Sequence, residues 1–244
     1  MATPTRGLVT TMTERPTGLG LLSFLHFADS AFPTGGYAHS FGLETYCQEG
    51  LVRGREDLER FLEAMIEGSA GPCDATAVVA ALRAARREDI QGCRDIDAML
   101  EAMKAVKEFR EGSRQMGRQT LRVAAALTGE ARLVRYAADV DKGLAPGHHA
   151  VAYGLAAAAL GWEPEWAATA YLYSTTALLV GAALRLLSMG QMEGQRVLWH
   201  LHPVIERAAR EAAAREAADL WSFAPGIEMA GIRHASLEMR LFRS

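Results

Sequence analysis

The chain has 244 residues, of which 50% are hydrophobic and 23% carry a charge, and its formal net charge at pH 7 is −3. This composition is typical of a globular protein, and the nearly balanced charge argues against a nucleic-acid binder, so we expect proteins or small ligands as partners. Cys47, Cys73 and Cys93 form no CxxC pair, which argues against a disulfide framework or a structural zinc site and fits a reducing cytoplasm.

The first 20 residues are rich in Thr, Pro and Gly and contain no apolar run long enough for a signal peptide, so we expect a flexible leader at 1–20.

An apolar run that follows the leader ends at Asp29. The turn that follows contains Pro33, which fixes φ, and Gly35 and Gly36, which can take positive φ values. This loop also carries an unusual set of aromatic and polar side chains: Phe32, Tyr37, His39, Ser40 and Phe41. We expect the two phenylalanines to anchor the loop in the core, and the loop either to shape a functional surface or to serve as a tight connection.

The rest of the chain has the apolar spacing of amphipathic or buried helices. Helices are expected at 55–70, 74–87, 89–103, 104–127, 133–140, 146–161 and 164–184, with two further helical segments in 191–220. We expect Gly71 and Pro72 to end the first of these helices, and Pro203 to separate the last two segments. No strand or hairpin pattern is present in the sequence. The predicted fold class is all-α: a single-domain bundle of about ten helices over residues 21–221.

The helix expected at 104–127 carries a row of basic side chains: Lys104, Lys107, Arg110, Arg114, Arg118 and Arg122. Such a row is either a solvated helix face, which is the commoner case, or a stripe on which a partner docks. The uncharged stretch from Trp166 to Leu184 is the nearest thing to a membrane span, but its Tyr, Thr, Ser and Ala content favours a helix buried in the bundle. No membrane contact is therefore expected.

The last stretch, 222–244, is expected to leave the helical pattern at Pro225 and Gly226 and to form a C-terminal tail. It ends in two large apolar residues flanked by arginines, a pattern that is common in interface anchors. We predict a partner-docking segment in this tail: Arg240, Leu241, Phe242 and Arg243.

The sequence contains no familiar catalytic or cofactor motif. The patterns GxxxxGK[ST], GxGxxG between strand and helix, HExxH and GxSxG are all missing. His148 and His149 are adjacent, and His200 and His202 are two residues apart, so neither pair shares a helix face. We therefore expect no catalytic residue, no metal site and no cofactor, and we favour a binding or scaffolding role.

Four blocks of the sequence together resemble the urease accessory protein UreF family: DSAFPTGGYAHSFGLETY at 29–46, HHAVAYGLAAAALG at 148–161, RLLSMGQMEGQRVL at 185–198 and HASLEMRLFRS at 234–244. They occur in the expected order and span essentially the whole chain after the leader. Ser188 departs from the pattern, because many family members have Pro there, and this change affects only a turn.

The resemblance implies an all-α homodimer that works in the cytoplasm without catalysing a reaction. Family members bind the accessory protein UreD, called UreH in some organisms, and with it recruit the nickel-carrying GTPase UreG to the urease apoprotein for nickel insertion. A modulating effect on the GTPase is also implied, and the small-residue faces around Gly154 and Gly181 would be packing features, or part of the dimer surface. The matching motifs place several residues on a partner-binding surface: Gly35, Gly36, Tyr37, His39, Ser40 and Arg240.

One alternative stays open from the sequence: a small helical enzyme that uses Tyr37, His39 and Ser40 with a bound ligand. Copurification with UreD and UreG would favour the scaffold. Turnover by the isolated chain would favour the enzyme.

Overall fold

The computed structural model describes residues 18–244, so most of the expected leader lies outside the described residues. The described part is built from α1 (Gly18–Ala28), α2 (Leu43–Gln48), α3 (Arg55–Met65), α4 (Thr76–Arg86), α5 (Ile90–Met103), α6 (Lys107–Thr128), α7 (Ala131–Asp141), α8 (His149–Ala159), α9 (Pro164–Leu186), α10 (Gln191–Ala214) and α11 (Pro225–His234). Short 3-10 turns lie at Gly36–Ala38 and Ala217–Asp219. No strand occurs within residues 18–244, and the predicted all-α bundle is confirmed.

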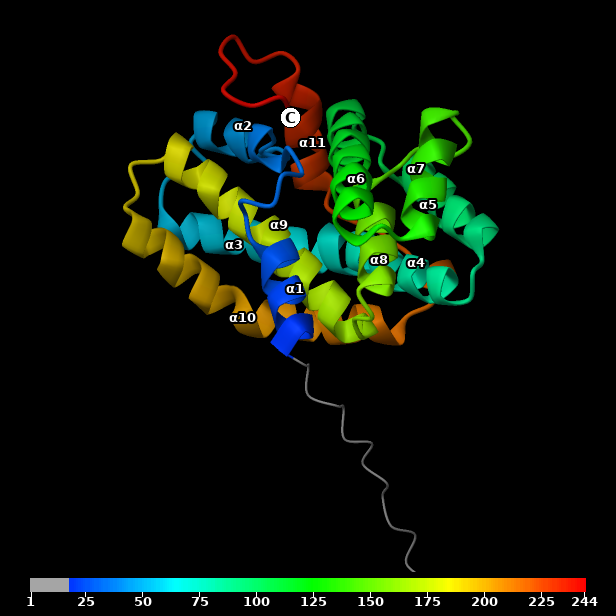
Figure 1. The fold of residues 1–244 in the computed structure, drawn as a ribbon. Helices are drawn as coiled ribbons and strands as arrows, with labels where there is room; N and C mark the ends of the chain where they lie inside the picture. Colours follow the sequence, from blue (N-terminus) through cyan, green and yellow to red (C-terminus); the bar gives the residue numbers. More distant parts are fainter. Residues whose placement is uncertain (1–17) are drawn as a thin grey trace, which may run out of the picture.

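Figure 1 shows α8 and α9 in the middle of the bundle, with α10 along one edge and the C-terminal segment beside α2 and α6 on the opposite side. Helices α4 and α8 form the centre of the core, because nearly all of their side chains are buried. They approach closely at Gly154, where a Cβ atom would lie 2.4 Å from the Val78 carbonyl oxygen. The small-residue pattern of 148–161 is therefore a packing surface between two helices.

The segment that joins α3 to α4 is a π-helical stretch, Ile66–Ala75, rather than the expected break at Gly71 and Pro72. Proline lacks a backbone N–H, and its ring crowds the carbonyl of the preceding turn, but the wider π turn relieves both problems. Gly71 helps, because a Cβ there would lie 2.8 Å from the Ile66 carbonyl oxygen. The predicted helix break is wrong at this position.

Two other expected breaks at proline are also wrong. Helix α10 continues through Pro203, which lies on its exposed face one turn after the exposed Trp199. Water can reach the Trp199 carbonyl that loses its helical donor, so the helix can continue through the proline. Pro225 is the first residue of α11, a position where the missing N–H has no helical partner to lose. The predicted tail at 222–244 therefore contains a helix.

Helix α9 is, among residues 18–244, the one helix long and apolar enough to cross a membrane by length and composition alone. In the structure 56% of its most apolar 18-residue window is buried, and it packs against α10, α4 and α1. These contacts are those of a core helix in a bundle, as the sequence indicated.

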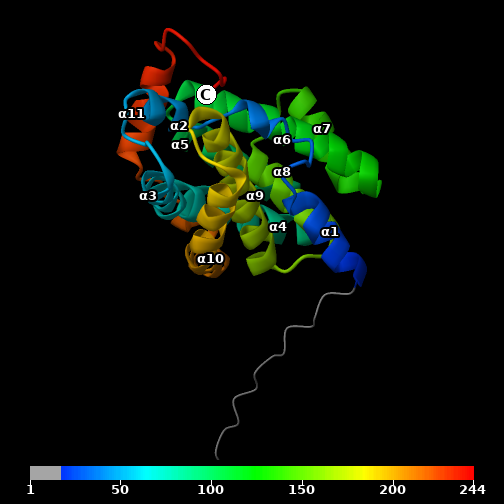
Figure 2. The same ribbon diagram turned by 90° about the vertical axis from the view of Figure 1, so that its left-hand side faces the viewer.

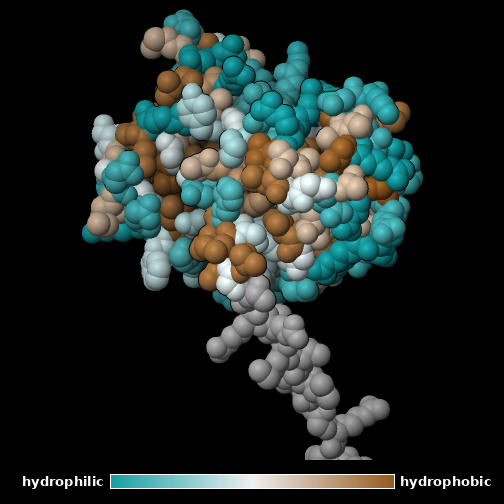
Figure 3. Space-filling model, viewed as in Figure 1, coloured by the Kyte–Doolittle hydropathy of each residue, from teal (hydrophilic) through white to brown (hydrophobic). Residues whose placement is uncertain are grey.

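Helix α1 lies on the outside of the bundle, beside α8 and α9 (Figure 2). It begins at Gly18, within the range expected for the leader. Several of its leucines face solvent, and Figure 3 shows them as a brown area in the lower middle of the view. The exposed members are Leu19, Leu21, Leu22 and Leu25. A continuous apolar helix face of this kind is unusual on a protein that has no partner.

Candidate functional site

The loop between α1 and α2 has the tight backbone that its sequence predicts, with one difference. Gly35 takes a left-handed φ of 78°, as expected, but Gly36 does not take a positive φ. Glycine is instead required at position 36 because there is no room for a side chain. A Cβ there would lie 2.2 Å from a Leu178 methyl carbon and 2.9 Å from the terminal Met116 methyl. Phe32 is buried and Phe41 packs against the core, so both expected anchors are confirmed.

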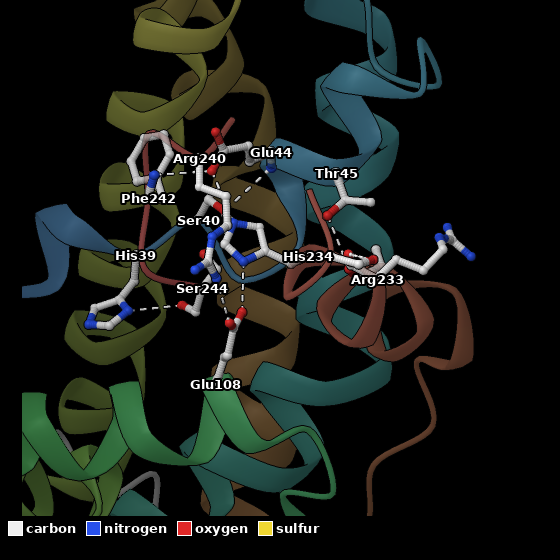
Figure 4. A network of polar contacts seen from close by, with 12 residues as sticks. His39, Ser40, Glu44, Thr45, Glu108, Arg233, His234, Arg240, Phe242 and Ser244 are labelled. Carbon is white, nitrogen blue, oxygen red and sulfur yellow. Dashed lines mark hydrogen bonds and ion pairs between the residues drawn. The ribbon is translucent and has the colours of Figure 1, made fainter. Parts of the chain in front are cut away.

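The C-terminal segment folds back onto this loop, as Figure 4 shows. The carbonyl oxygen of Ser244 accepts hydrogen bonds from the N–H groups of Ser40 and Phe41, at 2.6 and 3.0 Å, and from the Ser40 hydroxyl at 2.6 Å. His39 Nδ1 lies 2.8 Å from the Ser244 hydroxyl. These bonds hold Phe41 at a φ of 48°, a strained value for a residue with a side chain. Loop and tail therefore form one surface from segments about 200 residues apart.

Glu44 fixes the position of the C-terminal segment. Its carboxylate is buried in the first turn of α2, where the helix dipole favours a negative charge. One oxygen accepts the Leu241 N–H at 2.7 Å, and the other accepts the Phe242 N–H at 3.0 Å. A buried carboxylate that receives two backbone donors fixes the path of the chain, because an unpaired buried charge would cost several kcal/mol.

His234, the last residue of α11, completes this buried cluster. Its Nε2 lies 3.0 Å from Glu44, and its Nδ1 lies 2.7 Å from Glu108 on α6. The ring therefore bridges two carboxylates and joins α11 to both α2 and α6. The other Glu108 oxygen binds the Arg240 guanidinium at 3.0 Å. Helices α2, α11 and α6 and the C-terminal segment are thus joined through alternating acidic and basic side chains, visible in Figure 4.

Arg185, near the end of α9, joins the two aromatic residues of the surface. Its guanidinium carbon lies 4.2 Å from the centre of the Phe242 ring and 5.3 Å from that of Tyr37. One of its nitrogens also donates to the Tyr37 carbonyl oxygen at 2.7 Å. Guanidinium groups stack favourably on aromatic faces, so Arg185 orients Tyr37 while leaving its ring 74% exposed.

The structure brings all the sequence-predicted site residues together, in two layers. The solvent-facing layer consists of Gly35, Tyr37, Arg240, Leu241 and Arg243. The buried layer consists of Gly36, His39, Ser40 and Phe242. The outer residues are available to a partner, whereas the inner ones keep the loop and the tail in place.

Sequence reasoning did not select Glu44, Glu108 or His234 as site residues. Glu44 and His234 lie inside two of the family-like blocks, but a single Glu or His in a helix gives no signal of pairing across 190 residues. Arg185 lies in a third block, where a structural role was equally open. Only the folded arrangement shows that these residues act together.

The side chains that commonly ligate metals are not clustered in the described residues. Within residues 18–244, no group of three or more His, Cys, Asp and Glu side chains could hold a metal ion. Cys47 lies close to the surface described above, but burial, followed by the nearby charge of Glu44, raises the pKa of its thiol to about 12. A thiol with such a pKa stays protonated at neutral pH and is therefore a weak nucleophile.

Comparison with known proteins shows the family of this chain. The family model for UreF matches residues 52–202. A urease accessory protein UreF from Bacillus sp. (strain TB-90) is 32% identical over 224 residues, which are 92% of this chain and 99% of the relative. The protein of the same name from Lachnoclostridium phytofermentans is 34% identical over 92% of this chain and 98% of its own length, and that from Trichodesmium erythraeum is 31% identical over 91% and 95%. This chain therefore belongs to the UreF family of urease accessory proteins.

Proposed function

We propose that this protein is a non-catalytic scaffold for urease maturation. Together with UreD (UreH), it recruits the GTPase UreG to the urease apoprotein, so that nickel is inserted into the active site, and it modulates the GTPase while doing so. The family assignment supports the urease pathway. The observation that carries the proposal is the single surface made by the loop and the tail, whose buried residues hold the exposed ones in place.

The exposed residues have the properties of interface anchors. Tyr37 offers a large, rigid ring held by Arg185, and Arg240 offers a planar set of donors positioned by Glu108. Leu241 lies beside them and is 60% exposed. Such a combination of aromatic, apolar and guanidinium groups suits protein binding better than the binding of a small substrate.

A catalytic use of Tyr37, His39 and Ser40 has less support. His39 and Ser40 are buried, and each contacts Ser244, while Tyr37 points to solvent. A nucleophile and a base must approach a common reacting atom, but His39 and Ser40 are both turned to Ser244 inside the protein, and Tyr37 is not.

Homodimer formation in a reducing cytoplasm is part of the same proposal. The leucines of α1 form an exposed apolar face that a second copy would cover. The three cysteines of the chain are free, with Cys73 and Cys93 buried, which suits a compartment where disulfides are rare.

The proposal is tested by copurification and by urease activity in cells. We expect Tyr37→Ala and Arg240→Ala to abolish copurification with UreD and UreG and to lower urease activity strongly, with unchanged circular dichroism. Tyr37→Phe keeps the ring and removes only the hydroxyl, so this variant should retain binding. Arg210→Ala, which removes an exposed arginine paired to Glu206 on α10, is the matched control and should behave as wild type. Full urease activation in cells lacking this protein would contradict the proposal.

A further inference from the structure

A groove of about 1200 Å³ lies between the loop that follows α1 and the helices α6 and α7. Its apolar side is formed by Phe32, Leu121, Ala125, Val134 and Ala137. Val134 is 55% exposed, so the apolar side is open to solvent rather than filled by the protein itself. At one end the groove reaches Gly35, Gly36 and Tyr37 and is therefore continuous with the surface proposed above.

The α6 side of the groove is rich in hydrogen-bond donors. Gln115, Arg118, Gln119 and Arg122 line it at helical spacing. The structure divides the basic row of α6 into two parts. Arg110 and Arg114 both lie 3.5 Å from Glu101 and are used within the fold. Within residues 18–244, Arg118 and Arg122 have no hydrogen-bond or ion-pair partner, and both are exposed.

The lining of the groove carries two arginines and two acidic residues. Glu111 pairs with Lys107 on α6 at 3.9 Å. Asp141 on α7 has no ion-pair partner within residues 18–244. Two unpaired guanidinium groups one helical turn apart can each bind a carboxylate through parallel hydrogen bonds. The two neighbouring glutamines add neutral donors and acceptors along the same line.

We propose that this groove binds an acidic peptide segment of a partner protein. Carboxylates of the segment pair with Arg118 and Arg122, and an apolar side chain of the segment packs on Val134 and Ala137. The inference rests on the proposed function, because it supposes that a partner docks on the adjoining loop. It adds a second contact, of defined chemistry, to that interface.

Two other occupants fit the charges less well. The first 17 residues of this chain carry Arg6 and Arg15 against Glu14, so they would bring further positive charge to the arginines. A second copy that used the same face would bring two more arginines into the contact, because a two-fold interface pairs identical surfaces. An acidic segment from a different protein meets neither difficulty.

A charge reversal tests the role of the arginines. We expect the double variant Arg118→Glu and Arg122→Glu to bind the complex of UreD, UreG and urease apoprotein at least about tenfold more weakly than wild type and with a smaller salt dependence. The matched control, Arg87→Glu with Arg196→Glu, makes the same charge change at exposed arginines outside the groove and should bind as wild type. Equal binding by both double variants and wild type would overturn the inference.

A photo-crosslink identifies the occupant directly. With p-benzoylphenylalanine in place of Val134, irradiation of cells that express urease should join the groove to an acidic segment of another protein, identified by mass spectrometry. A crosslink to residues 1–17, to a second copy, or to a neutral or basic segment would overturn the inference, and so would the absence of a crosslink. If the wild-type chain formed no complex with UreD and UreG, the proposed function would fail, and the crosslink in cells would still show what the groove holds.

Discussion

Glu44 and His234 explain how single residues determine the shape of the proposed binding surface. Both side chains are buried: Glu44 accepts two backbone N–H groups and contacts His234, and His234 also contacts Glu108. Such a pair contributes little net stability compared with apolar residues of the same size, but removing one member leaves the other unpaired in the interior. The cluster therefore acts by selecting one path for the tail.

Glu44→Gln should loosen the C-terminal segment, because the amide nitrogen cannot accept a backbone N–H and His234 is left with Glu108 as its one carboxylate partner. We expect a loss of roughly 3 kcal/mol in the free energy of unfolding, measured by urea titration, with faster proteolysis at residues 235–244. Glu49→Gln removes a carboxylate of the same helix region that pairs with Arg233 on the surface, and it should cost less than about 1 kcal/mol. Equal losses in the two variants would contradict the assignment.

The buried side chain of His148 makes the stability of the protein depend on pH. Burial first, and then the nearby charges of Lys104, Arg114 and Arg110, lowers the pKa of His148 from 6.5 to about 3. The folded state therefore keeps a neutral ring, which bridges Ser113 and Glu101, while the unfolded state takes up a proton below pH 6.5. The stability that His148 contributes is complete above pH 6.5 and is lost as the pH falls towards 3.

Burial raises the pKa of the Asp97 carboxyl, so Asp97 changes the stability with pH in the direction opposite to His148. The contribution of His148 is therefore isolated by comparing wild type with a His148 variant. Between pH 7 and pH 5 we expect wild type to lose up to roughly 2 kcal/mol more unfolding free energy than His148→Gln. Denaturant titrations at both pH values measure the difference. Parallel pH profiles for the two proteins would show that His148 has an ordinary pKa.

At the scale of helices, the position of glycine decides whether it is needed. Gly154 and Gly181 occupy similar small-residue sequences, yet only Gly154 packs against a neighbouring backbone. A Cβ at Gly181 would have no neighbour within 4 Å, although that residue is in the middle of α9. The sequence could show that both faces are small, but not which one meets another helix.

Gly154→Ala should therefore destabilise the protein by roughly 1–3 kcal/mol, because α4 and α8 must move apart. Gly181→Ala should stabilise it by up to about 1 kcal/mol, since alanine favours the helix and meets no steric conflict. Thermal unfolding of the two variants gives the comparison. A stabilising Gly154→Ala would mean that α4 and α8 are not in close contact.

Helix α1 carries a prediction about assembly. Replacing Leu22 and Leu25 with arginine should convert the proposed dimer to a monomer, because two charges would be placed in the apolar contact. Leu144→Arg changes a leucine of similar exposure in the connection between α7 and α8 and should leave the dimer intact. Light scattering after size-exclusion chromatography measures both. A wild-type monomer, or a dimer that survives the double change, would contradict the α1 interface.

For the whole molecule, apolar spacing predicted the helices and the fold class, because periodic burial is a local property of sequence. The errors fall at Pro72, Pro203 and Pro225, where a local rule for helix breaking was overruled by a π turn, an exposed helix face and a helix start. The aromatic loop was recognised from its composition. Its partners in the buried cluster were not, since pairing between Glu44 and His234 depends on how distant segments meet.

The long separation between the loop and the segment that holds it has a consequence for biosynthesis. Residues 36–42 leave the ribosome about 200 residues before Ser244, which supplies the acceptor for their backbone. A partly translated chain can fold much of its helical core while this loop still lacks the bonds that set its shape. Other proteins would then recognise this surface only after Ser244 has been translated and has folded back onto the loop, so earlier engagement is disfavoured by topology.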